Sequence, residues 1–303
     1  MTPYHGTYTV MITPFTADGR AIDEAALARF VDWQIEQGIH GLIPLGSTGE
    51  FLSVTDEERH RVAELVIRGA AGRVPVFVGT AAESTWDAIR YSREAEALGA
   101  DGVMIIPPFY CTPTDDELYH HYKAIADAIG IPIMVYNNPA TSNVDMLPPL
   151  VARLARIDNV SYIKESTMDV TRVRDIVRLC GDSMTVFGGI MGYESFLNGA
   201  LGWVAVGSNL MPREFADMYR LCVESVDVAA ARALYRRILP VVELVGKHRY
   251  VTATKHALDR MGLPVGPPRP PRLPASGDDR TWVERTVSEL GLMVPPPQVA
   301  ASA

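Results

Sequence analysis

The chain has 303 residues, of which 48% are hydrophobic and 21% charged, and its formal net charge is -8. This length and composition can bury one barrel-sized core or two smaller ones. A pI near 5.4 excludes a general nucleic-acid or anionic-membrane binder, because both classes need clustered positive charge. Three widely spaced cysteines, Cys111, Cys180 and Cys222, indicate neither a disulfide framework nor a CxxC metal site. Without an apolar run of about 18 residues, we expect a cytoplasmic protein that has neither membrane nor nucleic-acid partners.

Eight short apolar segments recur along the first two-thirds of the chain, most of them after an amphipathic helical stretch. Strands that alternate with helices form parallel sheets, and eight such units favour a closed barrel over an open sheet. The fold class is therefore predicted to be α/β, with a (β/α)8 TIM barrel over residues 1–211. The expected strands are residues 7–15, 41–46, 75–80, 102–108, 132–138, 160–166, 185–190 and 202–208.

Helix signals agree with this alternation. Helices are expected at residues 22–37, 55–69 and 85–98, the second of which opens with a Thr-Asp-Glu-Glu capping box. From 212 to 295 the pattern predicts a C-terminal helical region, and 296–303 is expected to be a disordered tail. The proline-rich stretch 264–274 cannot be helical, since proline lacks the amide donor, so it is either a packed extended connector or a linker.

Lys164 lies near the end of the expected strand 160–166. The pattern of this segment predicts a buried strand, and an ammonium group is costly to bury. A neutral lysine amine is a nucleophile toward carbonyl carbon, which motivates a Schiff-base hypothesis. The alternative is a structural lysine that is exposed or paired with Glu165.

Two other strand ends carry groups that suit the same chemistry. Residues 46–50 (GSTGE) place two hydroxyls and free backbone amides where a helix would begin, an arrangement that binds carboxylate or phosphate. Taken alone, Ser47 and Thr48 could equally be caps of the next helix. Tyr136, at the end of the fifth strand, is suited to relay a proton, although a single buried tyrosine is more often structural. The combination with Lys164 favours an active site.

These motifs resemble the dihydrodipicolinate synthase and N-acetylneuraminate lyase family of class I aldolases. The resemblance rests on GSTGE at 46–50, on YNNP at 136–139 and on KES at 164–166, and it runs from about residue 6 to residue 274. It implies a barrel with C-terminal helices, assembled as a homotetramer made of two dimers. It also implies pyruvate or a related 2-oxo acid as substrate, with no metal and no cofactor.

The resemblance also implies a role for each site residue. Lys164 would attack the keto carbon of the 2-oxo acid, and Tyr136 would shuttle protons. Tyr110 would enter a neighbouring subunit's site and extend the proton relay through Ser47. The imine then acts as an electron sink for a carbanion at C3. Substrate binding is assigned to Thr48, Gly46, Gly189, Val204, Thr141 and Ser208.

Departures from the family pattern concern the second substrate. Thr141 stands where lysine-pathway synthases carry an arginine that receives a carboxylate, so condensation with aspartate semialdehyde is discounted. Sialic acid lyases have an acidic pair beyond the seventh strand, where this chain offers only Glu194. A mixed, moderately apolar distal pocket is expected from Thr141, Ser142, Met191, Tyr193, Ser208 and Asn209.

Several functions remain open from the sequence. The leading one is a class I lyase or aldolase that makes or breaks a C–C bond next to a 2-oxo acid. A dehydratase or deaminase of a 2-oxo-3-deoxy acid would use the same imine. A phosphosugar-binding barrel could use Gly188-Gly189 and Gly207-Ser208, and a non-catalytic binding protein is a further alternative, but both leave Lys164 and Tyr136 unexplained.

Two groups of residues are assigned no function. His120 and His121 are adjacent on an expected surface helix, where they point about 100 degrees apart and cannot share a metal. Lys247, Arg249 and Lys255 form a locally basic helix, which is expected to be a solvated face.

Overall fold

The computed structural model describes residues 4–247 and 249–294, so the tail expected at 296–303 lies outside the described residues. Eight parallel strands form one sheet, in the order β2-β1-β8-β7-β6-β5-β4-β3. A parallel bridge between Leu42 and Val76 joins the two end strands, so the sheet closes and the predicted TIM barrel is confirmed. The strands are β1 (Gly6–Val10), β2 (Gly41–Ile43), β3 (Phe77–Gly79), β4 (Gly102–Ile105), β5 (Ile133–Asn137), β6 (Val160–Glu165), β7 (Thr185–Gly188) and β8 (Gly202–Ala205).

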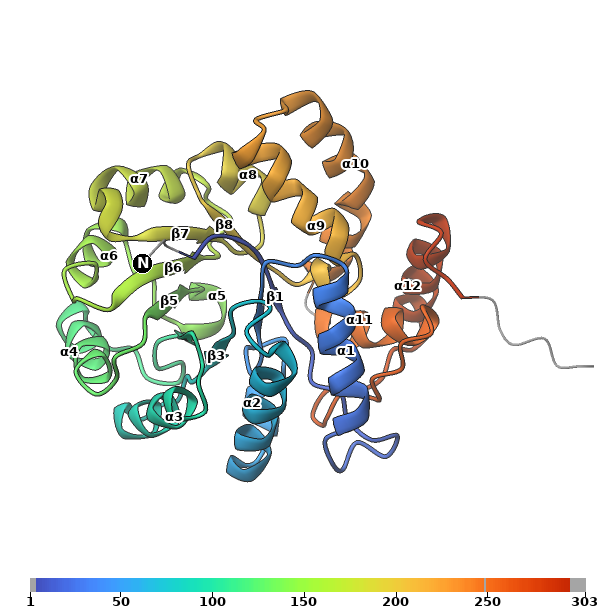
Figure 1. Cartoon of the computed structure of the whole chain (residues 1–303), viewed down its shortest axis with the longest axis horizontal. Helices are drawn as coiled ribbons and strands as arrows, with labels where there is room; N and C mark the ends of the chain where they lie inside the picture. Colours follow the sequence, from blue (N-terminus) through green and yellow to red (C-terminus); the bar gives the residue numbers. More distant parts are fainter. Residues whose placement is uncertain (1–3, 248, 295–303) are drawn as a thin grey trace, which may run out of the picture.

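Helices surround the strands, and the C-terminal helices lie to one side of the barrel (Figure 1). The capping box that opens α2 is present, with Thr55 and Glu58 each accepting the other's backbone N–H. The α-helices are α1 (Glu24–Glu36), α2 (Asp56–Ala70), α3 (Thr85–Ala97), α4 (Asp115–Ala126), α5 (Pro139–Ser142), α6 (Pro148–Leu154), α7 (Thr171–Cys180), α8 (Gly192–Leu197), α9 (Pro212–Tyr219), α10 (Val228–Val245), α11 (Tyr250–Arg260) and α12 (Gly277–Glu289).

Several strands are shorter than expected because the chain leaves the sheet at its polar end. Beyond β1, the Ile12 amide donates to the Asn209 side chain (3.1 Å) and the Phe15 amide to the Val265 carbonyl (3.0 Å). Beyond β8, residues Gly207–Asn209 form a 3₁₀ turn. These non-sheet partners free the strand ends for the site.

Aromatic rings fill the barrel interior. Tyr8 packs edge-on against Phe77 and Phe187, and Tyr162 does the same with both phenylalanines. Three of these side chains are fully buried and Tyr162 is nearly so, which makes the interior a packed core and not a pore. The site therefore has a rigid floor.

The C-terminal region packs closely onto the barrel. Helix α9 lies against β1, where the Thr7 hydroxyl donates to the Phe215 carbonyl (2.8 Å). The proline-rich stretch is a packed connector, since its backbone bonds the end of β1 through Val265 and its Arg269 bonds two barrel loops. No helix within the described ranges is long and apolar enough to cross a membrane.

The prediction of a surface helix at the histidine pair is correct for His120 and wrong for His121. His120 is exposed, whereas His121 is 5% exposed and its Nδ1 lies 2.8 Å from the Thr85 hydroxyl on α3. The face of α4 that carries His121 packs on the neighbouring helix and on the barrel. Burial lowers the pKa of His121 to about 4.

This burial predicts a loss of stability in acid. The unfolded chain, with an ordinary histidine pKa near 6.5, binds a proton at His121 that the folded chain excludes down to about pH 4. The free energy of unfolding therefore falls as the pH drops through this window, by about 2 kcal/mol between pH 7 and pH 5. Chemical denaturation at both pH values should show a smaller fall for His121→Gln than for wild type. His120→Gln is the control, and equal falls in all three proteins would contradict the assignment.

Candidate active site

The site is built on the pairing of β5 with β6. In their parallel register Tyr136 stands beside Lys164, and Lys164 in turn stands beside Phe187 of β7. Because register partners point to the same face of a sheet, the phenol and the amine enter the barrel together. The Nζ of Lys164 lies 3.9 Å from the centre of the Tyr136 ring.

Lys164 is a buried lysine that forms no ion pair with the adjacent Glu165. The side chain is 6% exposed, and its Nζ borders the central cavity. Glu165 points to the opposite face of β6, where its carboxylate accepts from Asn137 Nδ2 (3.0 Å) and from the Thr167 amide (2.8 Å). Burial raises the pKa of this carboxyl. The alternative of a structural Lys164–Glu165 pair is therefore excluded.

Asn138 sets the orientation of the Tyr136 hydroxyl. Its Nδ2 donates to the phenolic oxygen over 2.9 Å, and both residues are buried while bordering the cavity. Because the oxygen already accepts this bond, the phenolic proton is free to be donated toward the cavity. Tyr136 is thus arranged as a proton donor beside the Lys164 amine.

The loop after β2 supplies the predicted hydroxyls and amides. It is folded by two tight turns, in which the Gly49 amide donates to the Gly46 carbonyl (2.9 Å) and the Glu50 amide to the Ser47 carbonyl (3.2 Å). The Ser47 and Thr48 amides donate to no backbone carbonyl in the described chain. Both residues border the cavity, so the loop can receive an anion there.

The cavity above Lys164 has a volume of about 310 Å³. Its inner part is polar, with the amine, the phenol and the Ser47-Thr48 loop. Its outer wall is largely apolar and comes from Ile190, Val206, Val242 and Val245, with Lys247 and Thr141 as polar members. An amine nucleophile, a proton donor and an anion site therefore face one space that can hold a small carbonyl acid.

Comparison with known proteins agrees with this geometry. Residues 3–290 match the sequence family described as the Dihydrodipicolinate synthetase family. The chain belongs to this family. A 4-hydroxy-tetrahydrodipicolinate synthase of Pelobacter propionicus is 38% identical over 292 residues, covering 96% of this chain and 100% of the relative. One of Methylobacterium radiotolerans is also 38% identical, covering 95% of this chain and 96% of the relative.

Solved structures of the family are closely similar. The chloride-inhibited dihydrodipicolinate synthase of Acinetobacter baumannii, solved with pyruvate, has a TM-score of 0.93 and 32% identity, covering 96% of this chain and 100% of that one. A crystal structure of a protein from Pseudomonas aeruginosa has a TM-score of 0.90 and 35% identity, covering 95% of this chain and 100% of that one. Membership in the dihydrodipicolinate synthetase family confirms the predicted enzyme class, an aldolase-type lyase.

Three other residues expected to bind substrate border the cavity. Gly189 and Val204 are buried, and Thr141 lies exposed on α5. The Gly189 amide already donates to the Glu165 carbonyl (2.7 Å), and its carbonyl accepts from Trp203 Nε1 (2.7 Å). A Cβ at Gly189 would lie 1.8 Å from the Ser166 hydroxyl oxygen. Gly189 therefore shapes the wall by its small size.

The structure does not bring the other expected residues to the cavity. Ser208 is fully buried and does not line the cavity, and its hydroxyl accepts from Thr9 (2.9 Å) and donates to the Ala205 carbonyl (2.9 Å). Gly46 is buried, and a Cβ there would lie 2.7 Å from a Val10 methyl carbon. Tyr110 is 88% exposed and does not line the cavity of its own chain. Glu194 accepts instead from the Tyr235 hydroxyl (2.7 Å).

Sequence reasoning missed the contribution of the C-terminal helices. Tyr250, at the start of α11, borders the cavity near Thr48 and Tyr136, and burial raises the pKa of its phenol. The cavity wall also includes residues of α10 and the Lys247 that follows it. The sequence signal for this contribution is Gly246, which marks the end of α10. It does not indicate that the chain then passes beside the cavity.

The prediction of a solvated basic face is wrong for Lys255. This residue is 2% exposed, and its Nζ lies 2.8 Å from the Glu50 carboxylate, which is itself buried. Glu50 comes from the same loop as Ser47 and Thr48. The physical reason is that α11 packs this face onto the barrel, where a carboxylate compensates the buried charge.

Proposed function

We propose that this enzyme is a class I lyase in which Lys164 forms an imine with the keto carbon of pyruvate or a related 2-oxo acid. The observation that carries the proposal is the placement of the Lys164 Nζ. The Nζ lies beside the Tyr136 ring, the lysine is buried while bordering the cavity, and the adjacent carboxylate of Glu165 points away. A shielded amine that borders an open space is suited to add to a carbonyl group.

The neighbouring groups have complementary roles in this reaction. The Ser47-Thr48 loop would hold the carboxylate of the 2-oxo acid through hydroxyls and free amides. Tyr136, oriented by Asn138, would donate a proton to the keto oxygen as the carbinolamine forms and loses water. The protonated imine then withdraws electrons from C3, so that a C3–C4 bond can break or form.

The second reactant is proposed to be an aldehyde that is not held by an arginine clamp at position 141. Thr141 has no cationic group, and its hydroxyl donates to the Asn138 carbonyl over 3.2 Å. Ile190, Val206, Val242 and Val245 make the adjacent wall apolar. The relatives named above are synthases by name, yet a bidentate carboxylate contact at this position is not available to this chain.

The tetramer and the cytoplasmic location remain predictions. In a tetramer, Tyr110 of one subunit would reach the site of the next, which is consistent with its 88% exposure in the single chain. A solved relative with 30% identity is titled a monomeric variant, so assembly differs among related proteins.

Borohydride reduction in the presence of pyruvate tests the imine. We expect a reduced three-carbon adduct on Lys164, read by peptide mass spectrometry, because only an imine is trapped irreversibly. Lys255 is an internal control, since it is also buried but paired with Glu50, and it should stay unmodified. An unmodified Lys164 beside a positive aldolase control would exclude the mechanism.

Replacement of Tyr136 tests the proton donor. Tyr136→Phe should lower turnover by about two to four orders of magnitude, because general acid catalysis is lost while the ring remains. Tyr122→Phe is the control, since it removes a fully buried phenol that bonds the Ile105 carbonyl (3.0 Å) away from the cavity. Near-normal turnover of Tyr136→Phe would assign the proton transfer to another group.

A substrate screen decides which reaction follows the imine. Incubation with 2-oxo-3-deoxy acids should release pyruvate and an aldehyde if the enzyme is an aldolase. Release of water or ammonia without pyruvate would instead identify a dehydratase or a deaminase. Pyruvate with aspartate semialdehyde should condense slowly, because Thr141 offers no charge to the second carboxylate, and rapid condensation would contradict that reading.

A further inference from the structure

A buried ion pair joins the C-terminal helix α11 to the Ser47-Thr48 loop. Lys255 of α11 and Glu50 lie 2.8 Å apart, and their side chains are 1% and 0% exposed. The Lys255 ammonium also donates to the Pro267 carbonyl (3.1 Å) and lies 4.1 Å from the centre of the Phe15 ring. Burial lowers the pKa of Lys255 to about 8, so its charge depends on the Glu50 carboxylate.

Glu50 ends the Ser47-Thr48 loop in an unusual backbone conformation. Its φ is 57° and its ψ 38°, a left-handed conformation that is costly for a residue with a side chain. The second carboxylate oxygen accepts from the Arg269 amide (2.9 Å). Both oxygens therefore contact the C-terminal region, one through an ion pair with Lys255 and one through the Arg269 amide.

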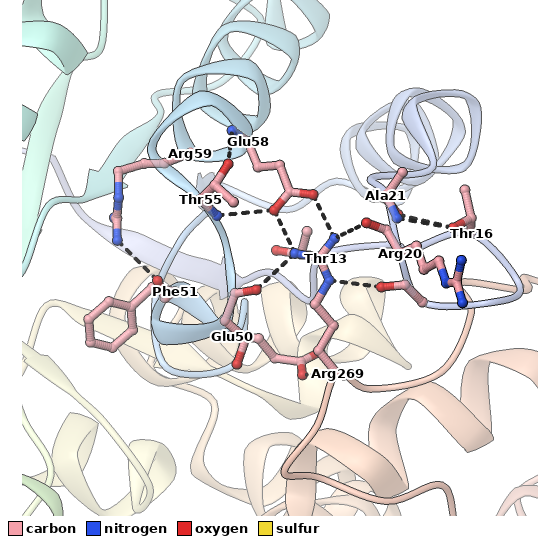
Figure 2. Close-up of polar contacts among 12 residues, drawn as sticks. Thr13, Thr16, Arg20, Ala21, Glu50, Phe51, Thr55, Glu58, Arg59 and Arg269 are labelled. Carbon is pink, nitrogen blue, oxygen red and sulfur yellow. Dashed lines mark hydrogen bonds and ion pairs between the residues drawn. The ribbon is translucent and has the colours of Figure 1, made fainter.

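Arg269 fixes the segment that supplies this amide. All five guanidinium N–H groups have acceptors: both oxygens of Glu58 (2.5 and 2.6 Å) and the carbonyls of Gly19, Arg20 and Ser53 (2.9, 2.9 and 2.8 Å). Figure 2 shows the guanidinium between α2 and the loop that carries Arg20. The Lys255 ammonium and the Arg269 amide together form a clamp on Glu50. Through the Arg269 side chain, this clamp is anchored to two barrel loops.

Stability alone does not account for this arrangement. A buried ion pair loses most of its Coulombic gain to desolvation, and apolar residues of similar volume often serve a core equally well. Within the pair, Glu50 lies two residues beyond Thr48 in the chain. The helix that carries Lys255, α11, also carries Tyr250, which lies next to Thr48. The position of the pair points to a role in holding the loop.

We propose that Glu50, clamped by Lys255 and by the Arg269 amide, is a positioning residue that sets the Ser47-Thr48 loop to receive the substrate carboxylate. The inference rests on the proposed function, because it concerns how the 2-oxo acid is held while Lys164 reacts. The clamp orients hydroxyl and amide donors and does not contact the keto carbon. Loss of the clamp therefore weakens recognition of the substrate carboxylate. The reactivity of the Lys164 amine stays unchanged.

Two keto compounds separate these effects. Pyruvate and methyl pyruvate present the same keto carbon, but only pyruvate carries a carboxylate. For each compound, borohydride trapping on Lys164 gives the concentration of half-maximal labelling, and the ratio of the two values is the carboxylate selectivity. In Lys255→Met and in Glu50→Gln this selectivity should fall about ten- to a hundred-fold, the loss expected for charge-assisted hydrogen bonds.

Matched variants separate positioning from folding. The double variant Glu50→Gln with Lys255→Met removes the clamp without leaving an uncompensated buried charge, so it supplies the measurement if a single variant does not fold. Asp279→Asn removes the ion pair with Arg249 in the same C-terminal region and should keep wild-type selectivity. Unchanged selectivity in the double variant would overturn this inference alone. Wild-type protein that neither compound labels would overturn the proposed function as well.

Discussion

The pairing register of β5 with β6 is the constraint on which the site depends. Successive residues of a strand point to opposite faces, so a slip of one residue would turn the Lys164 amine out of the barrel and bring the Glu165 carboxylate in. The observed register places Tyr136 beside Lys164. The aromatic floor of Tyr8, Phe77 and Phe187 excludes water from below. A closed barrel has no free edge at which such a slip could be accommodated.

The fold and the inner half of the site were predictable from the sequence, because their signals are local. Each strand is a short apolar run, and Lys164, Tyr136 and the Ser47-Thr48 loop all stand where such a run ends. The predicted strands run past the observed C-terminal ends of the strands. The partners that draw the chain out of the sheet are far away in the sequence, so no local signal marks these ends. The amide of Ile12, for example, bonds the side chain of Asn209.

The contribution of the C-terminal region to the site was not predictable, because it depends on contacts between segments far apart in the chain. Lys255 shares its helix with other basic residues and looked solvated, while its partner Glu50 lies near the opposite end of the sequence. Phe15 likewise contacts both the Lys255 ammonium and the Arg269 guanidinium, each 4.1 Å from its ring centre. Charge pairing across the fold leaves no periodic pattern that a single sequence reveals.

The two ends of the cavity are held by different contacts. At the inner end, Asn138 orients Tyr136, and the Lys255–Glu50 ion pair links the Ser47-Thr48 loop to α11, so the proposed imine site has little freedom. At the outer end, Thr141 and Lys247 are exposed and the remaining wall is apolar. In the proposed reaction, substitutions at the outer end would change which aldehyde fits and would leave the amine undisturbed. On the proposed function, the chemistry would therefore depend on the inner contacts, whereas the second substrate would be chosen by α5, α10 and the residues just beyond them.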